Sequence, residues 1–74
     1  MPERPQPTAE FVAGYLVDAA VQRMSVHSVM AVLRQYLDQG LHHCHLRKAL
    51  HMAGERLPQH EHLESYRRAV EAIG

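Results

Sequence analysis

The residues best suited to chemistry form a short run, His42-His43-Cys44-His45, in the middle of the chain. Imidazole and thiolate are ligands that zinc and similar ions prefer. Because successive helical residues point about 100° apart, only His42 and His45 could face one ion. Two more histidines, His60 and His62, are two residues apart, which is the wrong spacing for a shared helical face. No Cys-x-x-Cys or His-Glu-x-x-His pattern accompanies them, so we predict neither a metal site nor a cofactor. A pH-sensitive or metal-sensitive switch through His42, His45 and His51 is the remaining alternative for these residues.

Cys44 is the only cysteine and the only candidate nucleophile within this run. A nucleophile also needs a base within hydrogen-bond reach and a third group that orients the base. These groups usually meet in a cleft, which a chain of 74 residues can hardly form. No known catalytic pattern is matched, and we therefore predict that the protein is not an enzyme. A single cysteine cannot form a disulfide within the chain, which favours a reducing cytoplasm.

Charge and hydropathy argue against two broad classes of partner. Eight Lys and Arg balance eight Asp and Glu, so the whole molecule carries no general attraction for nucleic acid or for an anionic membrane. No apolar run approaches the ~20 residues that a membrane-spanning helix needs, and the first residues lack the order of a signal peptide. We expect a cytoplasmic protein that does not enter a membrane.

The elements that position these residues are predicted to be helices. Prolines dominate residues 1–7, which predicts a disordered lead-in followed by a single helical domain over residues 8–74. Thr8 can cap a first helix that runs from about Ala9 to Met24. Ser25 or Ser28 can cap a second helix with strong apolar periodicity.

The second half of the chain continues in the same way. The second helix is expected to end at Gly40, with Leu41 packing back on Tyr36 in a Schellman motif. A third helix runs from about His42 to Ala53 or Leu57, since Gly54 and Pro58 both favour a boundary, and a fourth covers about 59–73. The fold class is therefore all-α, a small bundle of three to four short helices with no sheet, because no polar and apolar alternation is present.

The first helix is apolar around most of its circumference. Such a helix is either central in a core or covered by a partner, and a short chain offers few neighbours to surround it. One interpretation is that the helix lies in a groove between the others and is fully used within the monomer. The other is that the helix serves two surfaces, one packed inward and one that binds a second protein. Its two edges are Phe11, Val12 and Tyr15 on one side and Val17, Val21 and Met24 on the other.

These observations favour a small protein–protein interaction module, such as a regulatory adaptor, co-chaperone or inhibitor. It would act through an apolar helix or groove on another protein or on a second copy of itself, as a dimer. The alternative is a transcriptional regulator resembling a helix-turn-helix protein, with Gly40 in the turn. In that case the DNA contacts would come from the third helix, from Arg47, Lys48 and Arg56.

Overall fold

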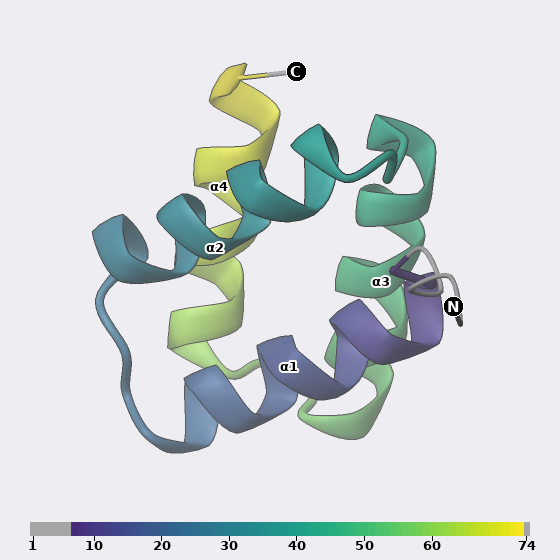
Figure 1. The fold of residues 1–74 in the computed structure, drawn as a ribbon. Coiled ribbons are helices and arrows are strands. Elements are labelled where there is room, and N and C mark those ends of the chain that lie inside the picture. Colours follow the sequence, from purple (N-terminus) through teal and green to yellow (C-terminus); the bar gives the residue numbers. More distant parts are fainter. Residues whose placement is uncertain (1–6, 74) are drawn as a thin grey trace.

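The protein is an all-α bundle, as the sequence predicts. The structure, a computed structural model, describes residues 7–73 with the exception of the Ile73 side chain, and most of the predicted lead-in lies outside this range. The described residues form four helices and no strand: α1 (Ala9–Val21), α2 (Val26–Asp38), α3 (His43–Arg56) and α4 (Glu61–Ile73). Figure 1 shows α1 crossing α3, and α2 crossing α4.

Side-chain caps fix the start of three helices. The Thr8 hydroxyl accepts a hydrogen bond from the Phe11 amide at 3.1 Å, and the Ser25 hydroxyl accepts one from the Ser28 amide at 3.2 Å. Thr8 is confirmed as a cap, and Ser25 rather than Ser28 caps α2. His60 serves α4 in the same way, because its Nδ1 accepts the His62 amide at 3.3 Å. Each bond satisfies a donor that the first helical turn leaves free.

Two helices end in Schellman motifs. At the end of α2 the Leu41 amide donates to the Tyr36 carbonyl at 3.0 Å, and Gly40 has φ of 112°, as the sequence predicts. The end of α1 has the same bonds, from Met24 to Ala19 and from Arg23 to Ala20. Here Arg23, with φ of 56°, takes the position that usually belongs to glycine. The predicted extension of the first helix to Met24 is therefore wrong by three residues.

All four helices contribute to one core cluster. The most extensive packing is between α1 and α3, and both helices contribute small buried side chains such as Ala13, Ala20, Ala49 and Ala53, all essentially without exposed surface. Small residues allow two helix backbones to approach closely. The larger buried side chains of the same core cluster are Leu16, Val29, Leu33, Leu46, Leu63, Tyr66 and Val70.

Candidate functional site

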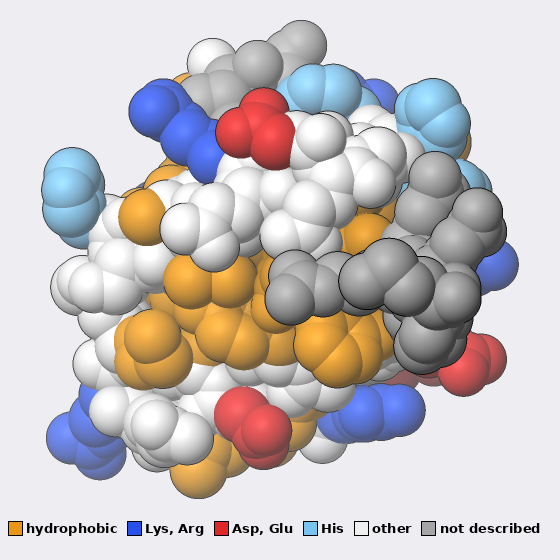
Figure 2. Space-filling view, in the orientation of Figure 1, with side chains coloured by type: hydrophobic (Ala, Val, Ile, Leu, Met, Phe, Trp, Pro, Cys, Tyr) orange, Lys and Arg blue, Asp and Glu red, His pale blue; other side chains and the backbone are white. Residues whose placement is uncertain are grey.

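Three aromatic rings meet where the N-terminal half of α1 faces the C-terminal end of α2. The Phe11 and Tyr36 rings lie 5.8 Å apart, and the Tyr15 and Tyr36 rings 6.0 Å apart, both edge to face. Edge-to-face contact is a favourable arrangement for aromatic pairs. We call this cluster of Phe11, Tyr15 and Tyr36 the aromatic face. Figure 2 shows hydrophobic side chains gathered on the side of the molecule where α1 and α2 lie in front.

The three residues of the aromatic face differ in how much of their surface is exposed to solvent. Phe11 keeps 59% of its surface exposed, although its ring contacts Tyr36. Tyr15 and Tyr36 are half-buried and pack against the core. A large ring that remains exposed beside two partly covered rings provides an apolar surface that a partner could cover.

The other predicted partner-binding residues of the first helix fall into three environments. Val12 has no exposed surface, so it belongs to the core and is unavailable to a partner. Val17 and Met24 are half-buried against the core, and Val21 is 62% exposed. At about 100° per residue, Val17 and Val21 lie on the opposite edge of the exposed side of α1 from Phe11. The six residues therefore do not share one surface, and Val12 is not on the surface at all.

The Tyr15 and Tyr66 phenols lie at the inner side of this region. The Tyr66 hydroxyl donates to the Met24 carbonyl at 2.6 Å, and the Ala19 carbonyl lies 3.3 Å from it. The Tyr15 hydroxyl is buried without a hydrogen-bond partner among the described residues. Burial raises the pKa of both phenols above 10.0, and a neighbouring phenol adds to each rise, Tyr36 for Tyr15 and Tyr15 for Tyr66.

These raised pKa values predict a loss of stability in alkali. Above about pH 10 the unfolded chain releases its phenolic protons while the folded chain still holds them. The free energy of unfolding should therefore be insensitive to these two groups below about pH 10 and fall above it, by up to about 1.4 kcal/mol per pH unit for each phenol. Urea unfolding over a series of alkaline pH values measures this slope. An equally steep slope in a variant with both tyrosines changed to Phe would contradict the assignment.

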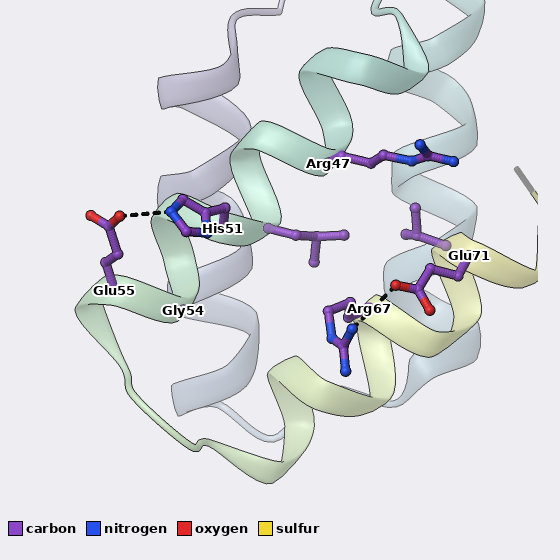
Figure 3. Close-up of a pocket in the computed structure, with 8 residues that line it drawn as sticks. Arg47, His51, Gly54, Glu55, Arg67 and Glu71 are labelled. Atoms are coloured by element: carbon purple, nitrogen blue, oxygen red, sulfur yellow. Dashed lines mark hydrogen bonds and ion pairs between the residues drawn. The ribbon is translucent and has the colours of Figure 1, made fainter.

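A second feature, a trough of 470 Å³ between α3 and α4, was not predicted from the sequence. Its apolar lining comes from Leu50, Gly54 and Val70. In Figure 3, Arg47 lies at one edge, and Arg67 and Glu71 lie at the other, joined by a hydrogen bond of 3.2 Å. His51 and Glu55, 2.9 Å apart, complete the lining.

The histidine run is spread around the start of α3. His42, His43, Cys44 and His45 are all exposed, and the His42 and His45 rings lie 5.6 Å apart. No group of three His, Cys, Asp or Glu side chains that could hold a metal ion occurs within residues 7–73.

The three cations proposed for DNA contact are all exposed on α3, but they do not form one face. Arg47 and Arg56 are nine positions apart, which at about 100° per residue places them on opposite sides of the helix. Arg47 lines the trough, whereas Lys48 does not.

None of the described helices combines the length and the apolar character that crossing a bilayer requires.

Comparisons with protein-family models, with curated proteins and with solved structures found no match.

Proposed function

We propose that this protein is a protein–protein interaction module, and that the aromatic face is the surface that binds the partner. The observation that carries the proposal is the exposed ring of Phe11, held in position by edge-to-face contact with Tyr36. Aromatic residues that are rigid and central to an apolar patch commonly provide most of the energy of an interface.

The surroundings of Phe11 suit this role. Tyr15 and Tyr36 are anchored in the core, so binding would not require these two rings to become ordered first. A preorganised surface loses less conformational entropy on association. An apolar helix of another protein, or α1 of a second copy, could cover the exposed ring in the way that amphipathic helices fill hydrophobic grooves.

Phe11→Ser tests the proposal, with Val21→Ser as its matched control. Both residues are exposed apolar side chains of α1, at 59% and 62%, but Val21 lies outside the aromatic face. We expect Phe11→Ser to weaken association by about 2 kcal/mol or more, or about thirtyfold, and Val21→Ser to leave it nearly unchanged. Sedimentation measures self-association, and capture from the native cell measures binding of another protein.

Neither substitution should unfold the chain, because both side chains are mostly in solvent. Thermal unfolding of the two variants checks this. If the wild type stays monomeric and both variants retain the same captured proteins as the wild type, the aromatic face is not the binding surface.

A further inference from the structure

The trough between α3 and α4 has a lining that the proposed function does not use. It shares no residue with the aromatic face, and its volume of 470 Å³ falls within the range of small-molecule sites. Its lining also combines an apolar floor with charged edges, which is the usual composition of such a site.

The charges of the lining balance. Two arginines, Arg47 and Arg67, stand beside two glutamates, Glu55 and Glu71. A ligand with a charge of one sign would be attracted by one pair and repelled by the other. A zwitterion can place each of its charges beside a side chain of opposite sign, and it therefore gains from both edges.

The two edges differ in how much of their hydrogen-bonding capacity is in use. Arg47 has no hydrogen bond or ion pair within residues 7–73, so all the donors of its guanidinium can serve a carboxylate. At the other edge Arg67 is shared between Glu64 and Glu71. Glu71 accepts a hydrogen bond from Arg67 through one carboxylate oxygen, at 3.2 Å. Its remaining lone pairs can accept hydrogen bonds from an ammonium group.

The floor favours a ligand that carries an apolar group beside its two charges. Leu50 and Val70 are almost fully buried, and they present their remaining surface to the trough. Gly54 has no side chain, and a Cβ placed there would meet no atom within 4 Å. The fold itself therefore does not require glycine at position 54. Because glycine has no side chain there, the trough stays open.

We propose that this trough binds a free apolar α-amino acid, with its carboxylate on Arg47, its ammonium on Glu71 and its side chain over Leu50, Gly54 and Val70. The ligand is small, zwitterionic and aliphatic, and it binds independently of the aromatic face. An open trough with two charged contacts should give a Kd on the order of 1 mM.

Nuclear magnetic resonance titration of the whole chain with L-leucine tests this proposal. Three analogues remove one feature each: 4-methylpentanoate lacks the ammonium, isopentylamine lacks the carboxylate, and glycine lacks the aliphatic chain. We expect leucine to shift the amide signals of α3 and α4 around the trough to saturation, and each analogue to bind about tenfold more weakly or not at all, as the loss of one charge-assisted bond implies.

Variants connect the binding to named side chains. Arg47→Gln and Glu71→Gln should each weaken leucine binding about tenfold, and Gly54→Leu should abolish it by filling the trough. Lys48→Gln is the matched control, because Lys48 is an exposed neighbour of Arg47 that does not line the trough. Phe11→Ser should also leave leucine binding unchanged, which separates this site from the aromatic face.

Two results would overturn the proposal. One is the lack of any saturable shift with leucine at tens of millimolar. The other is equal affinity for leucine and 4-methylpentanoate, because a site that needs both charges must discriminate between them.

Discussion

Tyr66→Phe is expected to lower the free energy of unfolding by about 1 to 3 kcal/mol, although it removes a single oxygen atom. The Tyr66 side chain has no exposed surface, and its hydroxyl donates to the Met24 carbonyl, just beyond the end of α1. Without the hydroxyl, this carbonyl loses the partner that α4 provides. The Met24 carbonyl is partly buried, and leaving such an acceptor unpaired costs more than the net gain from an average hydrogen bond.

Tyr15→Phe provides a control of opposite sign. The Tyr15 hydroxyl is buried without a partner among the described residues, so its removal relieves an unfavourable burial. This variant should be as stable as the wild type or more stable. In a domain of this size 1 kcal/mol shifts the melting temperature by roughly 4 to 8 °C, which thermal unfolding resolves easily. A Tyr66→Phe variant that melts at the same temperature as the wild type would show that the Tyr66 hydrogen bond has no net effect on stability.

Local sequence signals predicted where most helices begin and how α2 ends. Thr8 is the N-cap of α1, a position that favours a side-chain hydroxyl. Gly40 has a left-handed backbone conformation, which favours glycine. The end of α1 was mispredicted because Arg23 occupies a left-handed position that sequence patterns assign to glycine. Gly54 was interpreted as a boundary signal, yet it lies inside α3, which continues to Arg56. Pro58 was the better indicator of that boundary.

The candidate sites depended more on tertiary packing. Exposure of Phe11 fits the predicted apolar excess of the first helix, but that excess does not predict that the next residue, Val12, is fully buried. The trough depends entirely on how α3 and α4 meet, since Arg47 and Glu71 belong to different helices. Neither residue carries a local pattern that marks it as part of a site. Sequence periodicity predicts which side of a helix is apolar, but it does not predict which two helices will face each other.

Two neighbouring residues of α3 should respond in opposite directions to the same substitution. Ala53 has no exposed surface and lies in the core, on the helix that packs most closely against α1. Three additional carbon atoms there would force the helices apart or strain the new side chain, so Ala53→Leu should cost about 1 to 3 kcal/mol or more. Gly54 borders the open trough, and nothing lies within 4 Å of a Cβ built on it. Gly54→Leu should therefore gain up to about 1 kcal/mol from better helix propensity.

Urea unfolding of the two variants measures both changes, with Ala31→Leu, at an exposed position of α2, as the control for adding a leucine to a helix. The control should differ from the wild type by less than about 0.5 kcal/mol. A stabilised Gly54→Leu variant that no longer binds leucine would show that glycine at this position lowers stability while it keeps the trough open. If instead Gly54→Leu is destabilised as strongly as Ala53→Leu, the trough is closed in solution, and α3 and α4 pack more tightly than the structure shows.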